Sequence, residues 1–226
     1  MTVEEFSNEF DALLNSYSSI EYGHSIELDE YEKSVFLTKA QEEILLELYS
    51  GKNVLGESLE STEEIRRYLS PLIKTTKASE YTNVIKGITP KSCFYTLPSD
   101  LWFITHEYVI YEKGYQVCED LEYISVTPIT QDEYHKIKKN PFRGSTKNRV
   151  LRLDAGESIV ELVSEYPIDS YVVRYLSFPS PIILEDLPED LKINKVSSKT
   201  ECKLDKCLHK AILDRAVKIA LVYRHK

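Results

Sequence analysis

What this sequence has little of excludes several classes of protein. Seven glycines and nine prolines among 226 residues exclude collagen-like and low-complexity chains. No apolar run reaches the roughly 18 residues that a transmembrane helix needs, so no membrane contact is expected. Glu4 and Glu5 stand where a signal peptide needs basic residues, so secretion by that route is not expected. The remaining interpretation is a folded, acidic chain with one large domain or two small ones.

Metal-binding and catalytic motifs are missing as well. The four cysteines form no CxxC pair, whereas a structural zinc site needs paired ligands at short spacing. They are interpreted as free thiols in a reducing compartment. The sequence contains no GxSxG, GxxxxGK[ST], GxGxxG or HExxH motif, and His106, in an expected strand, has no Ser or Cys nucleophile context. We therefore predict no catalytic residue, no cofactor and no metal site.

Positive charge is scarce at the start of the chain and abundant at its end. Residues 1–80 carry 7 basic and 17 acidic side chains, residues 81–200 carry 14 and 17, and residues 201–226 carry 7 and 3. Most of these charges, taken one by one, are typical of solvated helix faces. Taken together, an acidic head and a basic tail can attract each other within one chain or between copies.

Helix signals dominate the first part of the chain. Three sites combine an N-cap residue with a glutamate three positions later, and each is followed by apolar residues at helical spacing. These sites are Thr2 with Glu5, Asp29 with Glu32, and Ser61 with Glu64. The second helix is expected to run to about Tyr49, where Gly51 provides a C-terminal stop. Pro71 predicts a kink or an end in the third helix.

The centre of the chain has the composition of β-strands. Six segments are rich in β-branched and aromatic residues: Cys93–Leu97, Leu101–Tyr111, Leu121–Val126, Val150–Leu153, Ile159–Val163 and Tyr171–Phe178. Residues 101–111 are mostly apolar on both faces, so we expect this strand to be covered on both sides. Thr130 and Glu133 predict a short helix over residues 130–139. Residues 154–157 are expected to form a hairpin loop, and the polar residues 185–203 a connecting loop.

A last helix is expected from about Lys206 to Tyr223, with two apolar stripes. One stripe contains Leu208, Ile212, Ile219 and Tyr223, and the other contains Leu213, Val217 and Leu221. A helix with two apolar faces is expected to be sandwiched. We expect the first stripe to pack on the N-terminal helices and the second to lie near a neighbouring subunit or another partner protein. The lysines of this helix would complement the acidic N-terminal region; they are Lys206, Lys210 and Lys218.

The strongest local charge feature is a basic run that contains no acidic residue between Tyr134 and Leu153. Its seven cationic side chains are Lys136, Lys138, Lys139, Arg143, Lys147, Arg149 and Arg152. One interpretation is a protruding segment that contacts phosphate or an acidic partner. The other is an ordinary exposed loop between a helix and a hairpin. Phe142 is the only aromatic residue within this run, and single-strand nucleic-acid binders usually carry more.

These signals predict an α+β fold in three parts. Residues 1–80 form an N-terminal helical region, and residues 81–200 form a central antiparallel β-rich region with a basic loop near 136–152. Residues 201–226 form a C-terminal helix that packs back on the helical region, so that the helices together make a bundle.

The order of these elements resembles that of head–tail connector (portal adaptor) ring proteins of short-tailed bacteriophages. The resemblance lies in Tyr175–Ile182, which reads YLSFPSPI, and in Leu204–Ala220, which reads LDKCLHKAILDRAVKIA. The segments MTVEEFSNEFDALLNS and DEYEKSVFLTKAQEEILLELYSG are similar to a structural protein of crAss-like gut phages. These segments cover about a third of the chain, and their motifs are loose.

The resemblance implies a non-enzymatic virion protein at the head–tail junction, assembled in the host cytoplasm. Its expected partners are copies of itself in a cyclic ring, expected to be a dodecamer, the portal protein, and further tail or ring proteins. DNA would pass through the lumen without sequence-specific binding. The family has no catalytic residues to carry over and no motif for the basic run. The alternative is a small nucleic-acid-binding or regulatory module that acts through residues 136–152.

Overall fold

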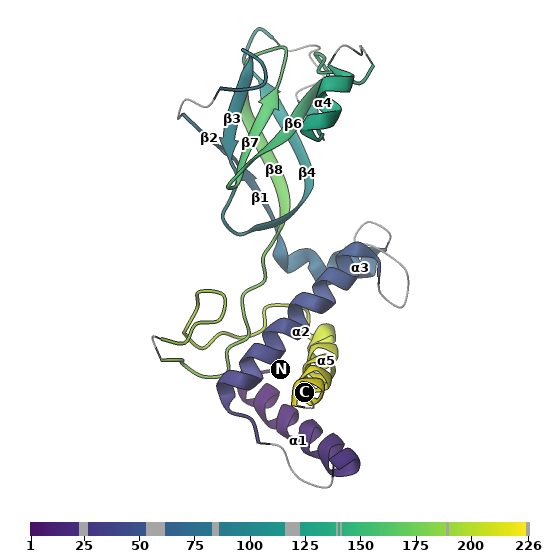
Figure 1. The fold of residues 1–226 in the computed structure, drawn as a ribbon, viewed down its shortest axis with the longest axis vertical. Helices are drawn as coiled ribbons and strands as arrows, with labels where there is room; N and C mark the ends of the chain where they lie inside the picture. Colours follow the sequence, from purple (N-terminus) through teal and green to yellow (C-terminus); the bar gives the residue numbers. More distant parts are fainter. Residues whose placement is uncertain are drawn as a thin grey trace. The chain divides into compact units, whose positions relative to one another are not determined.

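A computed structural model divides the chain into two compact units (Figure 1). The helical unit consists of Met1–Leu72 together with Pro179–Lys226, and the β unit consists of Ile73–Phe178. The β unit is therefore inserted into the sequence of the helical unit, which also includes residues 179–200. The structure describes residues 1–22, 27–52, 62–82, 86–115, 123–138, 140, 142–188 and 190–224.

Capping interactions explain where the first two helices begin. Helices α1 (Val3–Tyr22) and α2 (Glu30–Ser50) both start at capping boxes predicted from the sequence. In the first box, the Thr2 N–H donates to Glu5 Oε2 at 2.8 Å, and the Glu5 N–H donates to Thr2 Oγ1 at 3.2 Å. Gly51 ends α2 in the left-handed conformation, with φ 73°. These helix predictions are confirmed.

The third helix begins one residue later than the predicted cap. Helix α3 spans Glu63–Leu69, and its N-cap is Thr62, whose side chain accepts a backbone hydrogen bond. The predicted cap, Ser61, lies outside the described residues. A 3-10 turn at Ser70–Leu72 contains Pro71, so the helix ends where the proline indicated.

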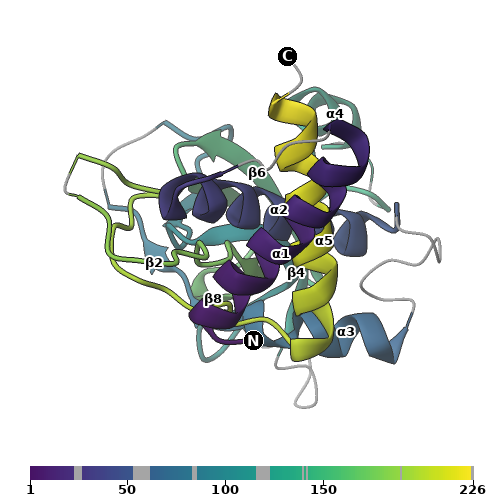
Figure 2. The same ribbon diagram turned by 90° about the horizontal axis from the view of Figure 1, so that it is seen from below.

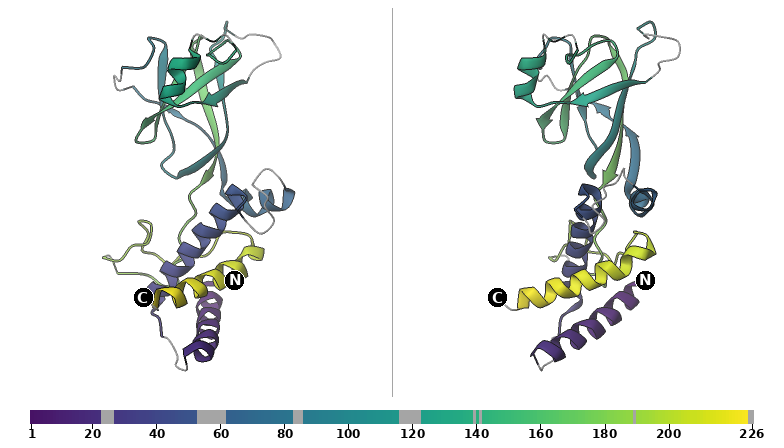
Figure 3. Two further views of the ribbon diagram at one scale, coloured as in Figure 1. Left: turned by 45° about the vertical axis from the view of Figure 1, so that its right-hand side comes forward. Right: turned by 90° about the vertical axis from the view of Figure 1, so that its right-hand side faces the viewer.

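Helix α5 (Lys206–Arg224) packs against both α1 and α2 (Figures 2 and 3). The ring of Phe6 in α1 lies 5.3 Å from the ring of His209, centroid to centroid. The Arg215 guanidinium donates to both carboxylate oxygens of Glu47 in α2, at 2.8 and 3.0 Å. Both apolar packing and charge therefore hold the C-terminal helix on the N-terminal ones.

The connecting segment, residues 179–205, lies along α2 without forming a helix or a regular strand among its described residues. Its backbone instead bonds to a buried polar stripe of α2, made of Ser34, Thr38 and Gln41. The backbone partners are Leu184, Ile182 and Ser180, respectively. These contacts satisfy peptide groups that would otherwise be buried without partners.

Apolar side chains hold the same segment in place. Ile183, Leu187 and Ile193 form a buried cluster, against which Tyr31 and Val35 of α2 pack. The absence of regular structure predicted for residues 185–203 is thus confirmed among the described residues. The segment is nevertheless a packed part of the helical unit, because six of its described apolar residues are buried: Ile182, Ile183, Leu184, Leu187, Ile193 and Leu204.

The β unit is built from eight described strands and one short helix. The strands are β1 (Ile73–Lys77), β2 (Ser79–Glu80), β3 (Ser92–Thr96), β4 (Leu101–Tyr111), β5 (Ile124–Pro128), β6 (Arg149–Gly156), β7 (Ile159–Val163) and β8 (Ile168–Ser177). The helix is α4 (Gln131–Ile137), which begins at the predicted Thr130 capping box. All six predicted strands are present, with bounds that are the same or differ by up to three residues, except that Leu121 and Glu122 of the predicted strand 121–126 lie outside the described residues.

The strand order is β1-β8-β4-β5-β6-β7-β3-β2, in a single sheet. β1 and β2 stand at opposite ends of this order but are joined in the chain through Ala78, so the sheet curls until it is nearly a barrel (Figures 1 and 3). Every neighbouring pair is antiparallel except β5 and β6, which are parallel. The α+β class is confirmed, and the expected antiparallel region contains this one parallel pair.

Two further expectations about the sheet are wrong in detail. The β6–β7 turn lies at Glu157 and Ser158, with φ 49° and 61°, and not at residues 154–157 as a whole. In β4, Val109 and Tyr111 are buried, whereas Tyr108 and Ile110 on the opposite face are only half-buried. The strand is therefore covered fully on one side only, because its buried face lines the inside of the curled sheet.

Candidate interaction surfaces

The topology of the sheet explains why most of the basic run lies in a connection between strands and not in a strand. Parallel neighbours need a crossover connection, whereas antiparallel neighbours can be joined by a tight turn. The connection from β5 to β6 contains α4 and residues 138–148, which include most of the basic run. Tyr134 and Ile137 of α4 pack with Leu151, Leu153 and Val163 on the outer face of the sheet (Figure 1).

The loop that follows α4 has a defined conformation. Asn140 accepts two hydrogen bonds from the backbone of the loop. Its side-chain Oδ1 accepts from the Phe142 N–H at 2.9 Å, and its backbone carbonyl accepts from the Gly144 N–H at 2.7 Å. Arg149 donates from Nη2 to the Phe142 carbonyl at 2.5 Å. These bonds hold Phe142 away from the protein, with 84% of its surface exposed.

The structure separates the seven predicted interface residues of the basic run. Lys136, Lys138, Arg143 and Lys147 are exposed, and Arg149 is half-buried because its guanidinium is bound to the loop. Lys139 lies outside the described residues. We call the four exposed side chains together with Phe142 the basic loop surface.

Arg152 does not belong to this surface, because strand alternation turns it into the interior. Along β6, Leu151 and Leu153 face α4, so Arg152 shares the opposite face with Val150 in the main core. Its side chain is 11% exposed, and its Nη1 lies 3.0 Å from both carboxylate oxygens of Glu107 in β4. The prediction that Arg152 contacts a partner does not fit this position.

A buried hydrogen-bond network completes the environment of Arg152. The Tyr171 hydroxyl of β8 donates to Glu107 Oε2 at 2.5 Å. Burial would by itself lower the pKa of Arg152, but the Glu107 carboxylate raises it on balance. Burial and then Glu107 raise the pKa of the Tyr171 hydroxyl. Arg152 and Glu107 therefore form a structural ion pair inside the β unit, and the Tyr171 hydroxyl is hydrogen-bonded to it.

The second apolar stripe of α5 is also covered within one chain. Leu213, Val217 and Leu221 are 2%, 0% and 9% exposed. Their predicted place at a subunit interface does not fit this burial, because α1 and α2 both pack on the helix. The exposed large apolar side chains among the described residues of α5 are instead Val222 and Tyr223, at 62% and 58%.

The charges that dock α5 differ from those expected. Lys206, Lys210 and Lys218 are exposed, and the ion pair with α2 comes from Arg215, which lies within 3.5 Å of Glu43 as well as contacting Glu47. Residues four apart share a helix face, so the Glu43–Glu47 spacing was the available sequence signal.

The surface of α1 and α2 remains strongly acidic. Residues 3–50 contain 12 acidic and 2 basic side chains. One of these two bases, Lys33, is buried and bound to Asp11 at 2.6 Å and to Glu30 at 2.9 Å. Glu5, Glu9, Leu13 and Tyr17 follow at i, i+4 spacing on α1; Glu5 and Glu9 are exposed, Leu13 is half-buried, and Tyr17 is 41% exposed. We call these four residues the α1 stripe.

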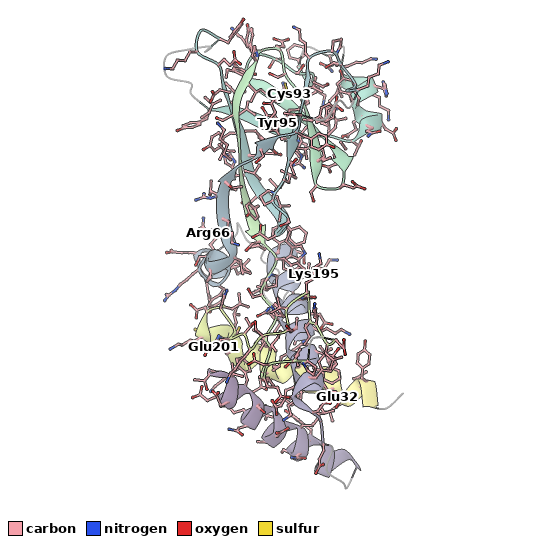
Figure 4. The ribbon with its side chains drawn as sticks, turned by 90° about the vertical axis from the view of Figure 1, so that its left-hand side faces the viewer. Glu32, Arg66, Cys93, Tyr95, Lys195 and Glu201 are labelled. Atoms are coloured by element: carbon pink, nitrogen blue, oxygen red, sulfur yellow. The ribbon has the colours of Figure 1, made fainter. Side chains whose placement is uncertain are left out.

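The part of the chain that the structure describes gives little support for a metal site, a reactive thiol or a membrane-spanning helix. No group of three or more His, Cys, Asp or Glu residues there is arranged to hold a metal ion. Burial raises the pKa of the thiols of Cys93 and Cys202, which disfavours reactive thiolates (Cys93 is labelled in Figure 4). Cys118 lies outside the described residues. None of the described helices is long and apolar enough to cross a bilayer.

Comparison with known proteins gives matches over the whole chain. The family described as phage tail ring protein 3/4 matches residues 1–226. Ring protein 3 of Bacteroides phage crAss001 is 48% identical over 223 residues, which cover 98% of this chain and 96% of that protein. Ring protein 4/5 of the same phage is 34% identical over 235 residues, with 97% of this chain and 92% of that protein covered.

Proposed function

Because this chain belongs to the phage tail ring protein 3/4 family, we propose that it is a non-enzymatic structural subunit of a virion ring. The observation that carries this proposal is the match over residues 1–226, which includes both units. The crAss-like resemblance found in the sequence agrees with the family. Copies of the chain would close into a ring through rotation, as a dodecamer.

Two different surfaces on separate units support a head-to-tail ring. Such an interface needs two complementary patches on each copy, because it is not self-complementary. The β unit carries the basic loop surface, and the helical unit carries acidic helices with 12 acidic and 2 basic residues in positions 3–50.

The proposed place of the ring is the head–tail junction, where it would connect the portal to the tail and leave a passage for DNA. Its partners would be the portal protein and other ring or tail proteins. The relatives support this, since a single phage has proteins named ring protein 3 and ring protein 4/5. The net charge of −9 suits a lumen that does not retain DNA. Assembly would take place in the host cytoplasm.

Electron microscopy of the full chain, alone and mixed with the portal and other ring proteins of its phage, tests this function. We expect closed rings that bind DNA weakly and without sequence preference. A chain that stays monomeric under all these conditions, and that binds DNA tightly in a salt-sensitive way, would instead support the nucleic-acid-binding module.

A further inference from the structure

We propose that the basic loop surface of one copy docks onto the α1 stripe of a second copy, with Phe142 as the apolar anchor of the contact. This inference rests on the proposed ring function and identifies the two surfaces that meet. It involves residues Lys136, Lys138, Phe142, Arg143 and Lys147 on one side, and Glu5, Glu9, Leu13 and Tyr17 on the other.

The exposure of Phe142 is a built feature of the loop. At 84%, it is the most exposed of the large apolar side chains in the described residues. The Asn140 side chain and the Arg149 guanidinium both bind its backbone, at 2.9 and 2.5 Å. Gly144 permits the close turn, since a Cβ there would lie 3.0 Å from the Asn140 carbonyl oxygen. An aromatic side chain held outward in this way loses little conformational freedom on binding.

Charge then selects the partner. The cations around Phe142 have no acidic residue near them in the sequence from 135 to 152, so a negative partner surface would complement them. The α1 stripe offers two carboxylates followed along the same helix face by a leucine and a tyrosine. An aromatic anchor with a cationic rim matches an apolar patch next to carboxylates in chemistry.

A protein partner fits better than DNA. The β unit as a whole is nearly neutral, with 13 basic and 14 acidic residues, so it generates no general attraction for phosphate. One aromatic residue is also few for a nucleic-acid platform. Every further copy of the chain carries the α1 stripe. Among the described residues, Lys33, Lys199 and Arg215 form ion pairs with other carboxylates of their own chain, and Glu9 forms no ion pair.

Complementary charge reversal tests the contact in the full chain. The loop variant is Lys138→Glu, Arg143→Glu and Lys147→Glu, and the helix variant is Asn8→Lys with Glu9→Lys, which leaves the Thr2–Glu5 capping box intact. Self-association is measured by analytical ultracentrifugation and the rings are counted by electron microscopy. We expect each variant alone to weaken association by at least about tenfold, because like charges then meet.

A one-to-one mixture of the two variants should restore association, because each reversed surface then finds an opposite partner on the other chain. Simple misfolding of either variant predicts no such rescue. Phe142→Ser should also weaken association while the charges stay unchanged. The matched control is Lys86→Glu, Lys91→Glu and Lys113→Glu, three exposed lysines elsewhere in the β unit, which should assemble normally.

The outcomes separate this proposal from the ring function. If the loop variant forms rings as well as the wild-type chain does, or if the mixture fails to restore association, the proposed contact is overturned. The ring function is unaffected by either outcome. A wild-type chain that forms no ring under any condition would overturn both. Normal rings from the loop variant, combined with lost retention on DNA, would assign the surface to nucleic acid.

Discussion

The β unit and the helical unit satisfy their buried peptide groups in different ways. In the β unit the strands satisfy one another's peptide groups, and the interior holds the ion pair of Arg152 with Glu107. In the helical unit, the connecting segment lacks strand partners, so Ser34, Thr38 and Gln41 of α2 supply the hydrogen bonds. Both units bury a cation in an ion pair, Arg152 with Glu107 in the β unit and Lys33 with Asp11 and Glu30 in the helical unit. The difference lies in the buried peptide groups, whose partners are mainly neighbouring strands in the β unit and side chains of α2 along the connecting segment.

The single tryptophan makes this comparison measurable. Trp102 lies in β4, stacked at 5.0 Å on Phe103, so its fluorescence follows unfolding of the β unit. Circular dichroism at helical wavelengths mainly follows α1, α2 and α5. Variants in one unit should shift one signal more than the other.

The largest effect is expected from Arg152→Met. It leaves the Glu107 carboxylate buried without its cation, which should cost about 3–5 kcal/mol in the free energy of unfolding. Urea unfolding followed by Trp102 fluorescence measures this loss. Arg143→Met, at an exposed position, is the control and should change stability by less than about 0.5 kcal/mol. Equal effects of the two changes would contradict the interior position of Arg152.

A smaller effect is expected from Thr38→Val in α2. Valine keeps the shape but loses the hydroxyl, which accepts from the Ile182 N–H at 3.1 Å and donates to the Ile182 carbonyl at 3.3 Å. The buried peptide groups lose partners, so the loss should be about 1–3 kcal/mol, seen in the dichroism transition. Thr38→Ser keeps the hydroxyl and should cost less. If Thr38→Ser is less stable than Thr38→Val, packing of the methyl group contributes more to stability than the hydrogen bonds do.

The helical unit should also lose stability in mild acid through His209. Burial lowers the pKa of this histidine, and the nearby α-amino group of Met1 also lowers it. His209 Nδ1 accepts from that amino group at 2.8 Å, so Nε2 carries the proton and donates to the Leu204 carbonyl at 3.1 Å. As pH falls below the ordinary value of 6.5, the unfolded chain gains a proton that the folded one resists.

The loss should reach at most about 1.4 kcal/mol for each pH unit in this window. Thermal unfolding followed by dichroism between pH 7.5 and 5.5 measures it, and His209→Gln should flatten the dependence. A wild-type slope that survives unchanged in this variant would assign the effect to other groups.

The smallest effect is a gain in stability from Lys195→Gly. Asn194 and Lys195 form the tip of the connecting segment in left-handed conformations, with φ 50° and 69° (Lys195 is labelled in Figure 4). Glycine removes the steric cost but adds freedom to the unfolded chain, so the net gain should be about 0.5–1 kcal/mol. Lys192→Gly, outside the turn, should destabilise slightly. A loss in both variants would show that the turn is not strained.

The elements that could be predicted from the sequence are those with local causes. The starts of α1, α2 and α4 depend on caps three residues apart, and the predicted strands depend on local composition. β1 was missed because Ile73–Lys77 reads IKTTK, which has no apolar alternation, and it forms a strand by pairing with β8. The parallel β5–β6 pair is likewise a property of the whole sheet.

The interaction surfaces also combine features with local causes, which the sequence predicts, and features that depend on the tertiary structure. Placing the basic run in a connection needed only charge and glycine signals, and four of its residues are exposed. The inward direction of Arg152 depends on the register of β6, and the burial of Val217 depends on how α5 meets two other helices. Neither fact is visible in the spacing of the residues themselves.

The insertion of the β unit has a consequence for synthesis on the ribosome. Helices α1 and α2 are translated first, but their partner α5 follows only after the whole of Ile73–Phe178. At about 5–20 residues per second, the delay is of the order of ten seconds. During that time the apolar faces of α1 and α2 have no α5 to cover them, and their excess of acidic residues provides the mutual repulsion that keeps nascent chains apart.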